Sequence, residues 1–151
     1  MRKEECKAMG EPVEYFVEGV PVAQPRVKAR AIGKQARVYT PDTADKWKAA
    51  VKASTRIKLK VRQGRYSLFL NFCLPRPKAH YRTGKNSHLL RDAAPEHHAQ
   101  KPDVDNLAKA VIDAMVDSGR VDDDCYLTSL TVTKEWSDAV PGVFIRFRLE
   151  D

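Results

Sequence analysis

The chain has 151 residues, enough for one compact domain over residues 1–151 and too few for two independent cores. The charged N-terminus has no apolar run behind it and no later stretch reaches membrane-spanning length, so we expect a cytoplasmic protein with no membrane partner. Three widely spaced cysteines argue against a disulfide framework and a thiolate zinc site, and a net charge of +7 suits a polyanionic partner.

The charge is divided unevenly along the chain. Residues 1–101 hold 22 Lys and Arg against 9 Asp and Glu, whereas residues 102–151 hold 5 against 11. An acidic segment on a basic protein would repel phosphate unless cations lay between the two. The contrast suggests a metal site that faces DNA, although both sets of charges could also be plain solvated surface.

The first third of the chain predicts a strand, a basic segment and a helix. Apolar residues alternate from position 13 and give a strand that ends at Gly19. The basic segment 21–39 has no helical pattern. Thr40-Pro41-Asp42 then has the form of an N-cap followed by proline, and predicts a helix that reaches about Lys58 with Trp47 on its buried side.

The middle of the chain predicts a second strand and a long loop. Apolar residues keep a period of two from Tyr66 to Leu74, and two prolines end that strand. Residues from about 75 to 101 are basic, contain all four histidines and lack apolar periodicity. We expect a long loop beside the functional site.

The last third predicts the clearest helix and two further strands. Apolar residues from Leu107 to Met115 mark one helical face, which Gly119 closes, and the helix should begin at Asp105 or Asn106. Strands are expected over 126–136 and 143–149. The order strand-helix-strand-loop-helix-strand-strand indicates a mixed α/β (α+β) fold, a single mixed sheet with helices packed on it.

An acidic constellation surrounds that helix. Asp103 and Asp105 are two positions apart in the sequence just before this helix. On extended backbone their side chains would point to the same side. Lys109 follows about one helical turn after Asp105 and can lean back toward the carboxylates. The triplet Asp122-Asp123-Asp124 lies past the far end of the helix, and could converge with the first pair if the next strand runs back beside the helix.

These residue types suit phosphodiester hydrolysis. Mg²⁺ prefers carboxylate oxygens and keeps several waters, one of which can become the nucleophile. A nearby ammonium would stabilise charge at the phosphate. The alternative is structural: Asp105 as an N-cap, Lys109 paired with Asp113, and the triplet as a turn. Together, on a basic chain, the residues favour the metal site.

The string KPDVDNLAKAVIDAM, followed by VDDDCYLTSLTVTKEW, resembles the RusA family of Holliday-junction resolvases. The hallmark of that family is D-x-D-N-L-x-K at the entry to a helix, with a further Asp about twenty residues on, before a strand ending in Lys. The likeness is strongest over 101–136. Weaker likenesses lie at 24–30, at 38–41 and in PRPKAHYRTGKNSHLL, which looks like phage and prophage members.

The resemblance implies the site residues and the activity. Asp103, Asp105, Lys109 and Asp124 match the catalytic positions, and the three acids match the metal ligands. Asp123 is the second choice for the last ligand, because on a strand only one of two neighbours would point into the site. The family implies a homodimer that binds four-way DNA junctions and makes paired, symmetric nicks with Mg²⁺, for which Mn²⁺ can substitute.

Basic residues before the acidic segment are the candidate DNA contacts, although each one singly is more often a solvated charge. We expect backbone phosphate contacts from Arg26, Lys28, Arg30, Arg37, Lys78, Arg82 and Lys85. Tyr39 and Tyr81 could stack on an unpaired base. His97 and His98 have no second ligand cluster at zinc spacing, so we interpret them as loop residues.

Two other functions stay open at this point. The chain could be a branched-DNA binding module whose acidic residues are only caps and turns. It could also be a nuclease of the same chemistry that acts on flaps or replication forks.

Overall fold

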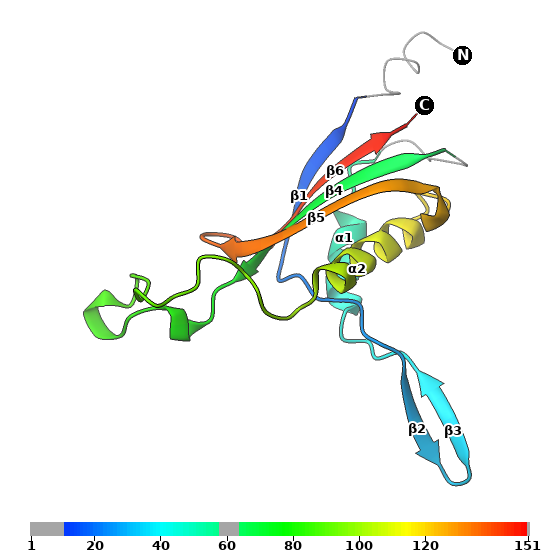
Figure 1. Ribbon diagram of the computed structural model, residues 1–151. Helices are drawn as coiled ribbons and strands as arrows, with labels where there is room; N and C mark the ends of the chain where they lie inside the picture. Colours follow the sequence, from blue (N-terminus) through cyan, green and yellow to red (C-terminus); the bar gives the residue numbers. More distant parts are fainter. Residues whose placement is uncertain (1–10, 58–63, 151) are drawn as a thin grey trace.

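The computed structural model describes residues 11–57 and 64–150. Its centre is a four-stranded sheet with the order β1-β6-β4-β5 (Figure 1). The strands are β1 (Val13–Glu18), β4 (Tyr66–Pro75), β5 (Leu127–Ser137) and β6 (Gly142–Leu149). Strand β4 pairs with β5 in parallel and with β6 antiparallel, which confirms the mixed sheet.

Two helices cover one face of this sheet: α1 (Asp45–Ala53) and α2 (Val104–Asp117). Every second residue of β4 from Tyr66 to Leu74 is buried, as the period of two predicts. These side chains pack against the apolar face of α2, from Leu107 to Met115. Strand β5 occupies the sheet edge and runs back along α2.

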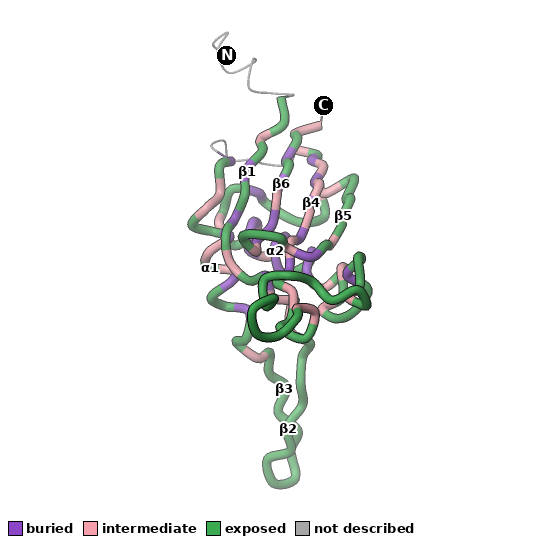
Figure 2. Tube along the Cα trace, turned by 90° about the vertical axis from the view of Figure 1, so that its left-hand side faces the viewer, coloured by how far each residue is buried: buried purple, intermediate pink, exposed green. Residues whose placement is uncertain are grey.

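The basic segment forms a hairpin that the sequence did not predict. Strands β2 (Lys28–Ile32) and β3 (Gln35–Tyr39) pair antiparallel as a second, two-stranded sheet. Every residue of both strands is exposed, and the hairpin projects away from the main sheet (Figure 2). The single expected sheet is therefore accompanied by a separate arm.

The predicted start of the first helix is wrong. Its N-cap is Ala44, which makes no side-chain cap hydrogen bond, and the helix ends at Ala53. Thr40 and Pro41 instead leave the hairpin and enter a turn in which the Asp45 N–H donates to the Asp42 carbonyl at 3.0 Å. Because the Asp45 N–H is bonded within this turn, it is not available for the hydrogen bonds of a helix that begins at Pro41. The predicted reach to about Lys58 is wrong as well, because residues 54–57 are not helical; Lys58 itself lies outside the described residues.

The expected loop is present between β4 and α2, but it has internal structure. It contains two short 3₁₀ turns, Lys78–His80 and Gly84–Asn86, and a β-bridge between Tyr81 and Leu90. Arginine side chains donate to its own carbonyls, for example Arg91 Nε to Tyr81 O at 2.8 Å. Among the described residues, no helix is long and apolar enough to cross a membrane.

Candidate active site

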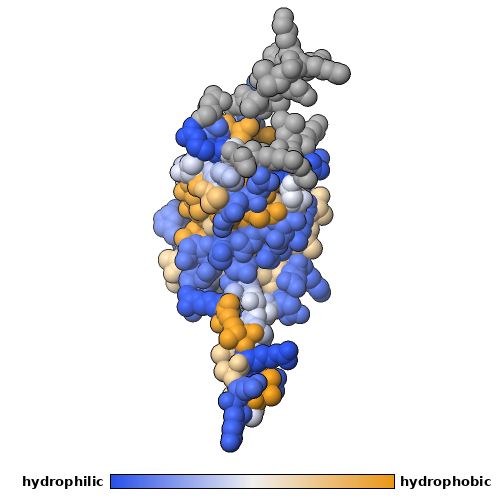
Figure 3. Space-filling view, turned by 90° about the vertical axis from the view of Figure 1, so that its right-hand side faces the viewer, coloured by the Kyte–Doolittle hydropathy of each residue, from blue (hydrophilic) through white to orange (hydrophobic). Residues whose placement is uncertain are grey.

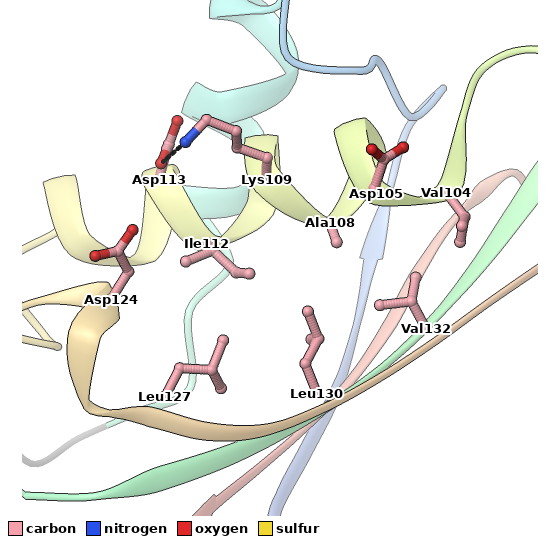
Figure 4. Close-up of a pocket in the computed structure, with 10 residues that line it drawn as sticks. All are labelled: Val104, Asp105, Ala108, Lys109, Ile112, Asp113, Asp124, Leu127, Leu130 and Val132. Atoms are coloured by element: carbon pink, nitrogen blue, oxygen red, sulfur yellow. Dashed lines mark ion pairs between the residues drawn. The ribbon is translucent and has the colours of Figure 1, made fainter.

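A groove separates α2 from the edge strand β5 (Figure 4). It encloses about 480 Å³ above an apolar floor, with charged side chains along the helix. The floor is formed by Val104, Ala108, Ile112, Leu127, Leu130 and Val132, and the charged residues are Asp105, Lys109, Asp113 and Asp124. Three of the four predicted catalytic residues therefore share this groove, and Asp103 is not among its lining residues.

Asp103 and Asp105 differ in their local structure. Asp103 is the N-cap of α2, with φ −71° and ψ 139°, and its carbonyl accepts the Leu107 N–H at 3.0 Å. Asp105 lies inside the first helical turn, so the expected start of this helix is wrong and the two acids do not share an extended segment. The positive end of the helix dipole favours a carboxylate at this position.

Lys109 is paired within its own helix. Its Nζ lies 3.7 Å from Oδ1 of Asp113, one turn further on. The Lys109 side chain is 58% exposed, so the ammonium group is open to the groove. Exposed ion pairs of this kind contribute only about 0.3–0.5 kcal/mol, so a phosphate could replace Asp113 as the partner of Lys109 at little cost.

The acidic triplet forms a turn rather than the start of a strand. Asp123 caps the 3₁₀ turn Asp124–Tyr126, with Oδ1 accepting the Cys125 N–H at 3.1 Å. That hydrogen bond lowers the pKa of Asp123, whereas a side-chain hydrogen bond with Asp123 and repulsion from it raise the pKa of Asp124. Asp123 is thus engaged locally, while Asp124 lines the groove.

A buried tyrosine lies under the triplet. The Tyr66 hydroxyl donates to the Asp123 carbonyl at 3.2 Å, which ties the start of β4 to this turn. Burial and the charges of Asp124 and Asp123 raise the pKa of Tyr66 to about 12. The tyrosine therefore stays protonated and acts as a donor at any physiological pH.

The carboxylates of the groove lie at two separate ends. Asp105 is in the first turn of α2, and Asp124 faces the last turns near Asp113. Asp105 and Asp113 are slightly more than two helical turns apart, about 12 Å. Over the described part of the chain, no three His, Cys, Asp or Glu side chains gather closely enough to hold a metal. Their oxygens suit Mg²⁺ chemically, but within one chain they do not converge.

The backbone before Asp103 is fixed to the end of β5. Lys134 Nζ donates to the carbonyls of Gln100 and Pro102, the latter at 2.9 Å. Two positions further on, Trp136 packs against the His98 ring, with centroids 4.0 Å apart. We call this pair of contacts, Lys134 on 100–102 and Trp136 on His98, the loop anchor.

Two more residues complete the surroundings of Trp136. His80 meets the indole edge-on at 4.9 Å, and the Arg76 guanidinium lies 5.4 Å from its centroid. His98 is buried, and burial together with the Lys134 charge lowers its pKa. Two of the loop histidines, His80 and His98, therefore pack on Trp136 and hold the chain that leads to Asp103.

The predicted DNA contacts divide between two exposed regions. Lys28, Arg30 and Arg37 belong to the β2–β3 hairpin, and Arg26 precedes it. The others, Lys78, Arg82 and Lys85, lie on the loop after β4. Part of Arg82 holds this loop together, since Nη2 lies 3.2 Å from Asp92 Oδ1 and Nε donates to the Leu90 carbonyl.

Comparison with known families decides the identity of the chain. The family described as Endodeoxyribonuclease RusA matches residues 18–148, nearly the whole sequence. The chain belongs to the RusA endodeoxyribonuclease family. None of the curated proteins compared with it matches. As a RusA-family member it is a DNA endonuclease of the Holliday-junction-resolving type, and the matched range includes the groove, the hairpin and the loop anchor.

The RusA groove contains charged residues that sequence analysis did not place in the site. Asp113 was considered only as a partner for Lys109, although its spacing from Asp105 puts both on one helix face. Lys48 of α1 lines an adjoining hollow of about 290 Å³ together with Asp113 and Asp124. The sequence places Lys48 on the basic face of its helix but not beside these acids, because that position depends on how α1 packs against α2.

The loop anchor predicts a pH-dependent stability. The pKa of His98 is lowered in the folded state, so neutral His98 favours folding. This contribution to the free energy of unfolding is fully present above the ordinary pKa of 6.5, and it is lost as the pH falls from 6.5 through the lowered pKa. We expect the melting temperature to fall less between pH 7.5 and pH 5.5 in His98→Phe, which keeps the ring on Trp136, than in the wild type. Thermal scans across this range would show it. Melting curves that shift in parallel would contradict it.

Proposed function

We propose that this RusA-family nuclease resolves four-way DNA junctions by paired, symmetric nicks and that it uses Mg²⁺, with Mn²⁺ as a possible substitute. The observation that supports this most directly is the groove, which Asp105, Lys109 and Asp124 line on a chain with a net charge of +7. A basic protein attracts DNA, and a carboxylate-lined groove can receive a phosphate only with cations in place.

In this proposal each groove residue has a distinct role. Asp105 and Asp124 hold the metal, with Asp103 beside them at the helix start. When bound, Mg²⁺ supplies an activated water and neutralises charge on the phosphate. Lys109 exchanges its weak pairing with Asp113 for the phosphate and stabilises the charge that develops there.

The separation of the carboxylates supports a homodimer. A two-fold axis across the middle of the groove would exchange its two ends. Asp105 of one copy would then face Asp124 of the partner subunit, and the same would hold at the second site. Each active site would be complete only in the dimer, and two identical sites suit a junction that is itself two-fold symmetric.

The centre of the groove has the chemistry expected of such an interface. Leu130, on the edge strand β5, is 43% exposed, and Ala108 and Ile112 face it from α2. Burying apolar surface at about 25 cal/mol per Å² favours its association with a second apolar surface. An isologous contact provides that surface, because the same residues occur on both copies.

Action on flaps or replication forks would use the same groove and chemistry with a different DNA shape. A non-catalytic junction-binding module would need the acidic residues only as caps and turns, which is the local role of Asp103 and Asp123. The Asp105 and Asp124 side chains also line the groove, which favours a nuclease. Because its substrate is DNA, we place the protein inside the cell.

Asp105→Asn tests the nuclease directly. We expect nicking of a labelled four-way junction in Mg²⁺ to fall more than about 100-fold, since even residues that only support metal ligands cost 10–100-fold. Junction affinity in EDTA should stay the same or rise slightly, because a negative charge near phosphate is removed. Denaturing gels and gel-shift titrations measure the two quantities.

Asp138→Asn is the matched control, because it removes the same charge from the exposed turn between β5 and β6. It should nick at the wild-type rate. If Asp105→Asn nicks junctions as well as this control does, the assignment of the groove is wrong. If the wild type binds junctions without nicking them in either ion, the binding module is correct.

The loop anchor should matter for the same reaction. Lys134→Met removes both donors to the Gln100 and Pro102 carbonyls, so we expect slower nicking and a higher Mg²⁺ requirement with unchanged junction affinity. Lys134→Arg, which keeps the charge and the donors, should recover most of the rate. A loss of junction affinity in Lys134→Met equal to its loss of nicking would indicate a DNA contact instead.

A further inference from the structure

The β2–β3 hairpin carries two arginines that face each other. Arg30 and Arg37 are directly paired across the ladder, and their side chains lie on the same face as Lys28 and Tyr39. Like charges placed opposite each other destabilise a strand pair. Residues 28–39 contain no Asp or Glu, and none of the ion pairs among the described residues involves a hairpin cation.

The position of the hairpin makes this arrangement more costly. All residues of both strands are exposed, and the arm extends from the body of the protein (Figures 1 and 2). A two-stranded hairpin alone is at best marginally stable in water. Opposed arginines on such an arm do not help the chain to fold, and they are best explained by an anionic or acceptor-rich surface that binds them.

The arginine face has a definite shape. Arg30, Arg37, Ile32 and Tyr39 surround a hollow of about 400 Å³. Ile32 and Tyr39 are 54% and 47% exposed, so apolar and cationic groups lie side by side on the arm, as Figure 3 shows for this part of the surface. Base edges are read by hydrogen bonds and by apolar contacts, and this face of the arm offers both kinds of group.

The other face of the hairpin is thin. It carries Ala29, Ala31, Ala36 and Val38, none of which extends far from the backbone. A two-stranded ribbon fits the DNA major groove, which is about 12 Å wide, and small side chains on one face ease its entry.

The base of the hairpin is fixed to the active site. The Gln24 N–H, just before β2, donates to the Asn106 carbonyl in the first turn of α2 at 2.9 Å. Asp105 is the neighbouring residue. A strand of five residues reaches about 17 Å at about 3.3 Å per residue, which is about five base pairs.

From these observations we infer that the hairpin enters the major groove of a duplex arm and that Arg30 and Arg37 donate to guanine O6 and N7 there. This inference rests on the proposed function and adds to it the feature that selects the cutting sequence. Lys28 and Lys34, at the two ends of the ribbon, contact phosphates. Junctions should then be cut preferentially within about five base pairs of a guanine on the contacted arm.

The test compares charge-conserving and charge-removing variants on junctions whose arms carry randomised sequences. Arg30→Lys with Arg37→Lys keeps both charges but loses the bidentate geometry. We expect the wild type to prefer guanine-containing arms and this double variant to lose roughly 5- to 150-fold of that preference per guanine contact. Total affinity and its salt dependence should change little.

Lys34→Gln is the matched control on the same hairpin. It should weaken binding evenly across sequences and leave the preference for guanine unchanged. The slope of log affinity against log salt concentration should become shallower by about 0.9. Selection by binding in EDTA is measured apart from nicking in Mg²⁺. Absence of nicking by the wild type would therefore refute the proposed nuclease, while the sequence selected in EDTA still tests the hairpin.

Two results would overturn the inference. The first is a wild-type protein without sequence preference, or a preference that the double lysine variant keeps in full. The second is a preference for gapped DNA that depends on Tyr39, which Tyr39→Ala would reveal, because stacking on an unpaired base would then explain the hollow.

Discussion

The parallel pairing of β4 with β5 is the constraint on which the rest of the structure depends. Parallel neighbours cannot be joined by a tight turn, so the chain must leave the sheet and return by a crossover. Here the crossover consists of the long loop and α2, and α2 lies along β5. The acidic motif therefore opens the crossover helix, and the acidic triplet closes it just before the strand.

This geometry has a consequence for catalysis. Asp124 lies near Asp113, about 12 Å along α2 from Asp105, and the described residues of one chain form no cluster that could hold a metal. The apolar floor between them, with the exposed Leu130, offers a surface for a second copy. The crossover thus separates the carboxylates along the helix, and the proposed two-fold partner would bring them together.

Much of the fold could be predicted from sequence because it depends on local periodicity. The alternation in β4, the apolar face of α2 and the stop at Gly119 were all read correctly. The hairpin was missed because half of its six apolar residues are alanines, which give a weak strand signal. The loop anchor joins His98 to Trp136, and no local pattern reports such a contact. The sequence also left open that the two acidic groups converge if the next strand runs back beside the helix; β5 does so, yet Asp124 lies near Asp113 and away from Asp105.

The central claim is that each active site takes Asp105 from one subunit and Asp124 from the other, and mixing two inactive variants tests it most directly. Asp105→Asn and Asp124→Asn proteins are refolded together, and heterodimers carrying two different tags are isolated. In a shared site one of the two centres of the heterodimer is fully wild type, so we predict that nicking returns, as single nicks rather than pairs. If heterodimers form and remain as inactive as either parent, both residues act within one chain and the account is wrong.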